Sequence, residues 1–284
     1  MTDALLRVEG LVKDFAGRRS FLDWLRRRPS RPVRALDGIS FELRAGEVLA
    51  LVGESGSGKT TTGNLLIGLM PASDGRVVLD GDDVGRLSGQ GLRRLRRRTQ
   101  MIFQDPYESL NPRMTVEDIV AEPLRVHRVT GSRSELAERV ERALTSAGLT
   151  PVAAYLRRYP FELSGGQRQR VVIAAALALE PSLIVADEPV SMLDVSIRAE
   201  ILNLLSALAR DEGIAIVMIT HDLSTVAAYA DRIAVMYLGR IVEHGPTREV
   251  LAHPRHPYAQ ALLSVVPVPD PTTRRRPVIL TGET

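Results

Sequence analysis

Cysteine is absent from this 284-residue sequence, and lysine occurs only at Lys13 and Lys59. The lack of cysteine excludes disulfides, thiolate zinc sites and iron–sulfur clusters. Long apolar runs are also missing, because the longest, at residues 171–179, is too short to cross a bilayer. The first residues lack the basic and apolar pattern of a secretory leader. We therefore expect a soluble intracellular protein.

Charge of one sign does not dominate the chain. The 37 basic residues, nearly all arginine, are almost balanced by 34 acidic ones, which leaves a net charge of +3. This balance argues against a general nucleic-acid-binding surface. The arginine runs at residues 24–34 and 92–100 are interpreted as solvated faces. Because lysine is so scarce, Lys59 is a candidate functional residue.

Apolar runs alternate with helical patterns, which predicts βαβ units and a largely parallel sheet. Strands are expected at residues 47–53, 182–189 and 214–222, and a helix at residues 61–70 that Pro71 stops. Each of these strands ends in polar residues whose side chains can bind a ligand or take part in catalysis. Ligands of open α/β sheets gather at such carboxyl ends.

The middle of the chain is predicted to be helical. Leu136, Val140 and Leu144 recur at fourfold spacing, and Gly148 is placed to end that helix. We expect residues 105–163 to form a helical subdomain inserted into an α/β core of residues 1–104 and 164–250. A hairpin is expected at residues 237–245, and residues 251–284 form a proline-punctuated extension with a short helix.

The stretch "GESGSGKT" at residues 53–60 fits the phosphate-loop pattern G-x-x-x-x-G-K-[ST]. Its glycines let the backbone wrap phosphate, Lys59 reaches the terminal phosphate oxygens, and the Thr60 hydroxyl can bind Mg²⁺. A chance glycine-rich turn is the alternative. The position between a strand and a helix favours nucleoside triphosphate binding.

Four polar residues lie at the ends of apolar runs. Asp187 and Glu188 end one strand, where one carboxylate can bind Mg²⁺ and the other can act as general base on water. Gln104 follows "MIF" and can touch both Mg²⁺ and water, whereas His221 ends the strand "IVMIT". The alternatives are a helix cap for the carboxylates, a surface glutamine and a structural histidine.

A second candidate anion site occurs at "LSGGQRQR", residues 163–170. A serine and two glycines precede an apolar helix, an arrangement that presents backbone N–H groups to an anion. This turn has no lysine of its own, although the chain already contains a complete phosphate loop.

Six motifs, "GESGSGKTT", "MIFQDP", "LSGGQRQR", "LIVADEP", "SMLD" and "ITHD", occur in the order typical of ABC-type ATPases, which this chain therefore resembles. The flanking "HPYAQALLSVVPVPDP" and the insertion at residues 17–34 resemble ATP-binding subunits of oligopeptide/dipeptide importers. The resemblance implies an α/β P-loop NTPase core with a mostly parallel sheet, an antiparallel β subdomain and an inserted α-helical subdomain. The ligands it implies are ATP and Mg²⁺.

The resemblance assigns roles to residues matching the family motifs. Gln104 resembles the Q-loop glutamine, His221 the switch histidine and Asp194 the D-loop aspartate at a dimer seam. Phe15 is the candidate for stacking on adenine, with a buried strand aromatic as the alternative. The ATP-binding residues implied are Phe15, Gly53, Ser55, Gly56, Gly58, Lys59, Thr60 and Thr61, and those implied for Mg²⁺ are Thr60, Gln104 and Asp187.

The family arrangement also explains the second turn. It implies a head-to-tail dimer in which Ser164, Gly165, Gly166 and Gln167 of one chain cap the γ-phosphate held by the other. The second chain is expected to be a related but non-identical ATPase. Further expected partners are two permeases and, indirectly, an extracytoplasmic binding protein, with this chain peripheral on the cytoplasmic face of the cell membrane.

The resemblance therefore predicts an ATPase that energises uptake of oligopeptides or dipeptides. "VSM" at residues 190–192 departs from the family's usual "TSA", which leaves oligosaccharides or nickel-type solutes as further substrates. A soluble ABC ATPase acting on nucleic acid and a noncatalytic scaffold subunit are the alternatives. The lack of a long heptad run disfavours the first, and Lys59, Glu188 and His221 disfavour the second.

Overall fold

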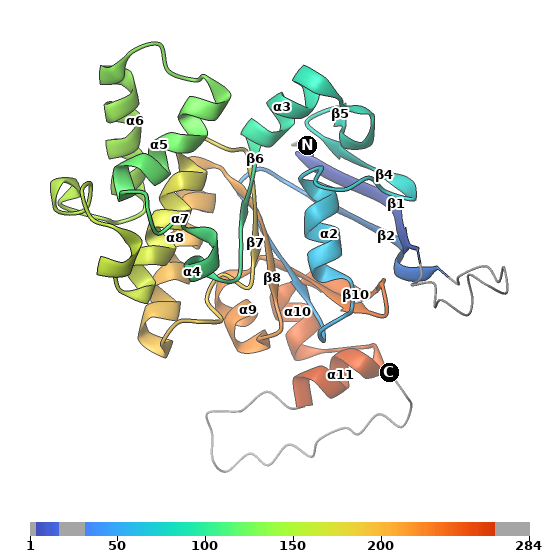
Figure 1. The fold of residues 1–284 in the computed structure, drawn as a ribbon. Helices are drawn as coiled ribbons and strands as arrows, with labels where there is room; N and C mark the ends of the chain where they lie inside the picture. Colours follow the sequence, from blue (N-terminus) through green and yellow to red (C-terminus); the bar gives the residue numbers. More distant parts are fainter. Residues whose placement is uncertain (1–3, 17–31, 265–284) are drawn as a thin grey trace, which may run out of the picture.

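Two β-sheets organise the protein in a computed structural model that describes residues 4–16 and 32–264 (Figure 1). The strands are β1 (Leu6–Phe15), β2 (Val33–Leu43), β3 (Val48–Val52), β4 (Asp74–Leu79), β5 (Asp82–Asp83), β6 (Thr99–Ile102), β7 (Leu183–Asp187), β8 (Ala215–Thr220), β9 (Arg232–Tyr237) and β10 (Arg240–Pro246). The helices are α2 (Lys59–Leu66), α3 (Gly89–Arg98), α4 (Pro106–Ser109), α5 (Val116–His127), α6 (Arg133–Ser146), α7 (Gly165–Leu177), α8 (Val195–Glu212), α9 (Leu223–Tyr229), α10 (Thr247–Ala252) and α11 (Pro257–Ser264).

The larger sheet has six strands in the order β10-β9-β3-β8-β7-β6. Every pairing from β9 to β6 is parallel, and β10 pairs antiparallel with β9 as a hairpin. Each residue of β3, β7 and β8 is buried, as expected for continuous apolar strands covered on both faces. The predicted mostly parallel sheet is confirmed. A hairpin is present as predicted, but its first strand, β9, begins at Arg232, five residues before the predicted start at residue 237.

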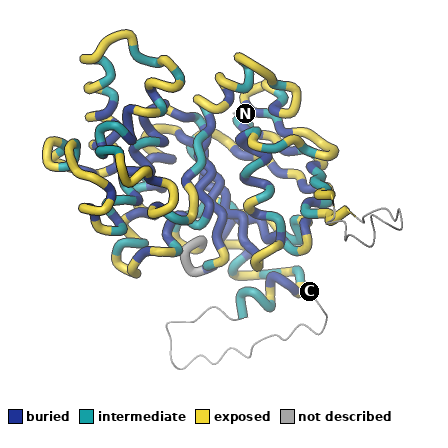
Figure 2. The backbone as a smooth tube through the Cα atoms, in the orientation of Figure 1, coloured by how far each residue is buried: buried dark blue, intermediate teal, exposed yellow. Residues whose placement is uncertain are grey.

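Successive side chains of the central strands enter different hydrophobic cores. In β7, Ile184 and Ala186 pack with α5, α6, α7 and α8, whereas Leu183 and Val185 pack with α2 and the smaller sheet. The strand alternation therefore places α2 and α7 on opposite faces of the six-stranded sheet. Figure 2 shows this sheet as the most continuously buried part of the backbone.

The smaller sheet is antiparallel and has four strands in the order β2-β1-β4-β5. It lies on the α2 side of the larger sheet, where Leu6, Val8 and Leu11 of β1 are fully buried or nearly so. An antiparallel β subdomain beside the parallel core is the fold class that the sequence predicts.

The helices at residues 105–163 begin and end at recognisable caps. Thr115 and Ser132 accept hydrogen bonds from the N–H groups three residues later and so begin α5 and α6. Gly148 has a left-handed φ of 75° and follows α6, which confirms its predicted role at the helix end.

The helix expected at residues 61–70 is four residues too long at its C-terminus. Helix α2 ends at Leu66, and Gly68 takes a left-handed φ of 67°. The Leu69 N–H then donates to the Asn64 carbonyl and the Gly68 N–H to the Leu65 carbonyl, which is a Schellman motif. The apolar pattern continues past the helix because Ile67 is still buried.

The short helix predicted in the C-terminal extension is α11, whereas the predicted start of the extension, residue 251, falls within α10. Helix α11 lies below the larger sheet beside α10 (Figure 1). The rest of the extension, residues 265–284, and most of the insertion predicted at residues 17–34 lie outside the described residues.

Candidate nucleotide site

The phosphate loop leaves β3 and enters α2 as predicted. Gly58 has a φ of 105°, and a Cβ there would lie 2.7 Å from the Ala35 carbonyl oxygen, so a larger residue would disrupt this turn. Ser55, Gly56 and Thr60 are exposed along the loop, where a ligand can reach them. Thr61 is half-buried in the first turn of α2.

Lys59 is 6% exposed and turns back along the loop. Its Nζ donates to the carbonyl oxygens of Gly53 and Glu54, each at 2.7 Å. Burial lowers the pKa of its ammonium group, and the carboxylates of Glu188 and Asp187 partly oppose that shift. Carbonyl oxygens of the phosphate loop thus hold the Lys59 ammonium group within the loop.

Asp187 ends β7 with 8% of its surface exposed, close to the start of α2. Burial raises the pKa of its carboxyl group, and the hydrogen bond from Thr60 and the charge of Lys59 oppose this rise. Hydroxyl and carboxylate oxygens are the ligands that Mg²⁺ takes alongside water and phosphate. Thr60 and Asp187 therefore fit the predicted ion, while the described residues contain no cluster of three acidic, histidine or cysteine side chains able to hold a metal alone.

Glu188 joins the ends of three adjacent strands. One carboxylate oxygen lies 2.8 Å from Nδ1 of His221, which follows β8, and the other accepts a 3.1 Å hydrogen bond from Nε2 of Gln104, which follows β6. Because an ionised carboxylate can only accept, Nδ1 of His221 donates to it. The structure therefore brings the three predicted catalytic side chains together. The predicted contact of Gln104 with Mg²⁺ stays a prediction.

The backbone of Glu188 is strained, with a left-handed φ of 47°. Its N–H donates to the Ile219 carbonyl at 2.9 Å, and Ser191 donates from its hydroxyl to the Glu188 carbonyl at 3.1 Å. The unusual residue pattern at 190–192 thus retains a serine that fixes the Glu188 main chain. Sequence reasoning missed this contact of Ser191.

The second turn begins α7 with a capping box. Ser164 accepts from the Gln167 N–H at 3.3 Å, and the Gln167 side chain accepts from the Ser164 N–H at 3.1 Å. Ser164 is exposed, and the Arg168 guanidinium stacks 4.1 Å from the ring centre of Tyr107. Helices α7 and α2 cover opposite faces of the sheet, so this turn and the phosphate loop lead into different cores of the chain.

Asp194 lies immediately before α8 and is exposed. Two apolar neighbours, Met192 and Val195, are 58% and 80% exposed. The predicted dimer-seam residue therefore lies on a surface that also carries uncovered apolar side chains.

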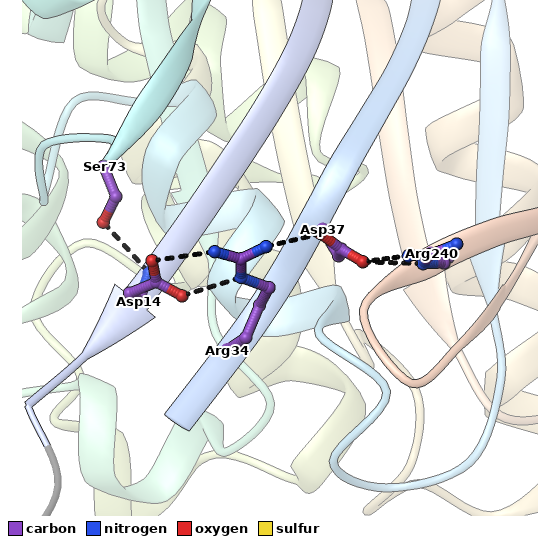
Figure 3. A network of polar contacts seen from close by, with 5 residues as sticks. All are labelled: Asp14, Arg34, Asp37, Ser73 and Arg240. Carbon is purple, nitrogen blue, oxygen red and sulfur yellow. Dashed lines mark hydrogen bonds and ion pairs between the residues drawn. The ribbon is translucent and has the colours of Figure 1, made fainter. Parts of the chain in front are cut away.

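Phe15 ends β1 and is 40% exposed, so the alternative of a buried strand aromatic is wrong. It pairs in register with Val33 of β2, and the next part of β2 packs against Gly58 of the phosphate loop. Asp14 and Asp37 hold Arg34 between β1 and β2, and Asp37 also binds Arg240 (Figure 3). This network joins the ends of β1 and β2, next to Phe15, to the start of β10.

One contact to the phosphate loop comes from the C-terminal extension, the segment whose sequence resembles oligopeptide/dipeptide importer subunits and not ABC-type ATPases in general. The Glu54 N–H donates at 2.9 Å to the hydroxyl of Tyr258, which lies in α11. Tyr258 belongs to the "HPY" stretch of the C-terminal extension. No spacing rule reveals this contact, because 204 residues separate its partners.

Two family profiles match the sequence. The profile described as "ABC transporter" covers residues 36–191, more than half of the chain, and spans the phosphate loop, the second turn and the Asp187–Glu188 pair. The chain belongs to the ABC transporter family. A second profile, "Oligopeptide/dipeptide transporter, C-terminal region", covers residues 242–283, which include α11.

Relatives with curated names are similar along nearly the whole chain. The oligopeptide transport ATP-binding protein OppF of Bacillus subtilis is 47% identical over 98% of this chain and 87% of its own length. A probable peptide ABC transporter ATP-binding protein, y4tS, of Sinorhizobium fredii is 49% identical over 100% of this chain and 78% of its own length. The glutathione import protein GsiA of Escherichia coli K12 is 49% identical over 99% of this chain, which spans 44% of GsiA.

Solved ABC cassettes share the fold. The dimeric cassette MJ0796, in a post-hydrolysis state bound to ADP and phosphate, is 28% identical with a TM-score of 0.72 and covers 86% of this chain and 99% of its own. The cassette cbiO1 of Clostridium perfringens, part of the ABC transporter complex cbiONQ, is 31% identical with a TM-score of 0.75 and covers 88% of this chain and 92% of its own. The ABC-type P-loop fold and the ATPase class predicted from the sequence are thus confirmed. None of the helices in the described part of the chain is long and apolar enough to span a membrane.

Proposed function

We propose that this chain is the ATP-hydrolysing subunit of an importer for oligopeptides or dipeptides. The observation that carries the proposal is the meeting of Gln104, Glu188 and His221 beside the Thr60–Asp187 pair and the phosphate loop. Adjacent parallel strands end at this edge, so their side chains converge where an α/β sheet binds its ligand.

In this proposal the phosphate loop binds ATP and Lys59 exchanges its carbonyl contacts for phosphate oxygens. Thr60 and Asp187 would hold Mg²⁺, with Gln104 as a further ligand, and the bound ion would neutralise charge on the phosphates. Phe15 stacks on the adenine from the end of β1, and Ser55, Gly56 and Thr61 complete the nucleotide contacts.

Glu188 acts as general base on the attacking water. Its carboxylate takes a proton while the water oxygen bonds to the γ-phosphorus, and the bond from that phosphorus to the bridging oxygen breaks with its electron pair leaving on ADP. Gln104 and His221 orient Glu188 from either side, which keeps the proton acceptor fixed before the reaction.

The active form in this proposal is a head-to-tail dimer. The opposed positions of α2 and α7, the exposed Ser164 and the uncovered apolar residues beside Asp194 support it. The partner in this proposal is a related but non-identical ATPase. The turn of this chain at Ser164, Gly165, Gly166 and Gln167 would complete the partner's nucleotide site, and the corresponding turn of the partner would complete the site of this chain. The solved structure of MJ0796 bound to ADP and phosphate is dimeric, which supports a dimeric form for this chain.

Transport is proposed from the relatives and from the C-terminal profile. OppF and y4tS are named for peptide transport, and the profile over residues 242–283 is described by oligopeptide and dipeptide transport. We infer two permease partners, a position on the cytoplasmic face of the membrane and delivery by an extracytoplasmic binding protein. No comparison supports the nucleic-acid alternative, and ATPase activity stimulated by DNA would contradict transport.

Glu188→Gln tests the catalytic assignment in the transporter complex purified through a tag on this chain. We expect ATP binding to persist and ATP turnover to fall by at least about a hundredfold, since loss of a general base typically costs 10²–10⁴-fold. Glu200→Gln is the matched control, because it removes an exposed carboxylate that pairs with Arg170 on the helical side. If Glu188→Gln turned over ATP at a rate near that of Glu200→Gln, Glu188 would not be the general base.

A further inference from the structure

The C-terminal extension reaches the phosphate loop through one buried side chain. Tyr258 is 3% exposed, and its hydroxyl accepts the Glu54 N–H at 2.9 Å. Glu54 directly follows Gly53, the first glycine of the phosphate-loop motif. A residue of α11 is therefore attached to the first peptide of the loop, outside the set of residues that sequence motifs assign to the nucleotide.

Several contacts fix Tyr258 in this position. Its ring packs against Tyr237 of β9 with 4.3 Å between ring centroids. Ahead of α11, the Glu243 carboxylate accepts the N–H groups of Arg255 and His256, each at 2.9 Å. The segment is thus tied to the β9–β10 hairpin, and the Tyr258 hydroxyl is presented to the loop on a rigid support.

The peptide unit that joins Gly53 to Glu54 is held at both ends. Tyr258 accepts its N–H at 2.9 Å, and the Lys59 ammonium group donates to its carbonyl oxygen, that of Gly53, at 2.7 Å. When Lys59 turns to a phosphate, the Gly53 carbonyl loses that donor, whereas the Tyr258 contact is made at the N–H of the same peptide unit and does not involve Lys59. The hydroxyl then remains to keep the start of the loop in place.

We propose that Tyr258 is a positioning residue for the phosphate loop and that the "HPY" segment of the C-terminal extension thereby sets the nucleotide affinity. The proposal rests on the nucleotide site assigned above. Tyr258 does not touch ATP in it. Its hydroxyl fixes the Glu54 peptide, so that the N–H groups after it are already arranged for phosphate and less ordering is needed on binding.

Tyr258→Phe is the direct test, because it removes the hydroxyl and keeps the buried ring. We expect the Kd of the purified chain for ATP and ADP to rise about three- to tenfold, the range for one lost hydrogen bond. The Tm is expected to stay near that of the wild type, since the exposed Glu54 can bond to water instead. Tyr237→Phe is the matched control, because it removes the hydroxyl of the stacked ring and leaves the Glu54 contact intact.

A second measurement reads the loop itself. Amide hydrogen exchange of a peptide covering residues 53–58 is expected to become faster in Tyr258→Phe without nucleotide, and to stay at the wild-type rate in Tyr237→Phe. Equal Kd values for Tyr258→Phe and wild type, or an equal loss in Tyr237→Phe, would overturn the proposal while leaving the nucleotide site intact. A wild-type chain that does not bind ATP would contradict the nucleotide site itself.

Discussion

Gly165 and Gly166 are neighbours in the second turn, yet their surroundings differ. A Cβ on Gly165 would lie 3.4 Å from Leu193 and 3.7 Å from the Tyr107 hydroxyl, which are ordinary contacts. A Cβ on Gly166 would lie 2.6 Å from Cγ2 of Ile197, a branched side chain with little rotamer freedom. Gly166 is thus also needed for the packing of α7 on α8.

Gly166→Ala is therefore expected to destabilise the isolated chain by about 1–3 kcal/mol through overpacking. Gly165→Ala, the matched control, gains helix propensity without a clash and is expected to be neutral or slightly stabilising. Urea unfolding of both variants measures the difference. Equal stability of the two variants would show that α8 gives way at Ile197 without cost.

The residues of the site differ in how far the sequence predicted them. Glu188, Gln104 and His221 follow recognisable strands, so their meeting at one sheet edge follows from parallel pairing. The Tyr258–Glu54 contact depends on where α11 packs, and Ser191 acts through a turn whose backbone conformation no motif records. Periodicity places elements, but it does not orient the loops that connect them.

At the scale of elements, strands are predicted better than helix ends. Runs such as β7 and β8 are fully buried and therefore stand out as apolar segments. Helix α2 ends before its apolar pattern does, because Gly68 and the bonds of the Schellman motif stop it at Leu66. Gly148 ends α6 in the same way, so glycine placement was the better signal in both cases.

The ends of β1, β2 and β10 are joined by charges. Asp37 accepts from Arg240 at 2.7 Å and from Arg34 at 3.0 Å, and Arg34 also binds Asp14 (Figure 3). The hydrogen bonds from Arg240 and then Arg34 hold the pKa of the Asp37 carboxyl below its ordinary value of 3.8. The unfolded chain therefore binds this proton more readily than the folded protein.

This network predicts an acid-dependent contribution to stability. Because the folded pKa is lowered, the stabilisation is fully present above the ordinary value of 3.8 and is lost as the pH falls through the folded pKa. Asp37→Asn should thus lower the free energy of unfolding at pH 6, and the difference from wild type should shrink at pH 3. Urea titrations at both values measure it, with Asp211→Asn on α8 as an exposed control. If Asp37→Asn lowered the free energy of unfolding by the same amount at pH 6 and at pH 3, the stabilising role assigned to the ionised Asp37 carboxylate would be contradicted.

At the scale of the whole molecule, one chain carries two turns proposed to bind anions, and the helices that follow them pack in different cores. The phosphate loop leads into α2 on one face of the six-stranded sheet, and the second turn leads into α7 on the other. A single chain that hydrolyses ATP alone would have no use for the second turn. In the proposed head-to-tail dimer both turns are used, which would make assembly part of the catalytic mechanism.

Ser164→Arg tests this claim most directly, because it places a long, charged side chain at the exposed start of α7 while leaving the phosphate loop untouched. Ser164→Ala is the control, since it removes the same cap, worth about 1 kcal/mol, without adding bulk. Two quantities are compared: the ATP affinity of the purified chain and the ATP turnover of the assembled complex. We predict that Ser164→Arg keeps the affinity within about a factor of ten of wild type, or about 1.4 kcal/mol, and abolishes turnover. Loss of ATP binding by the purified chain, or wild-type turnover in the complex, would contradict the head-to-tail account.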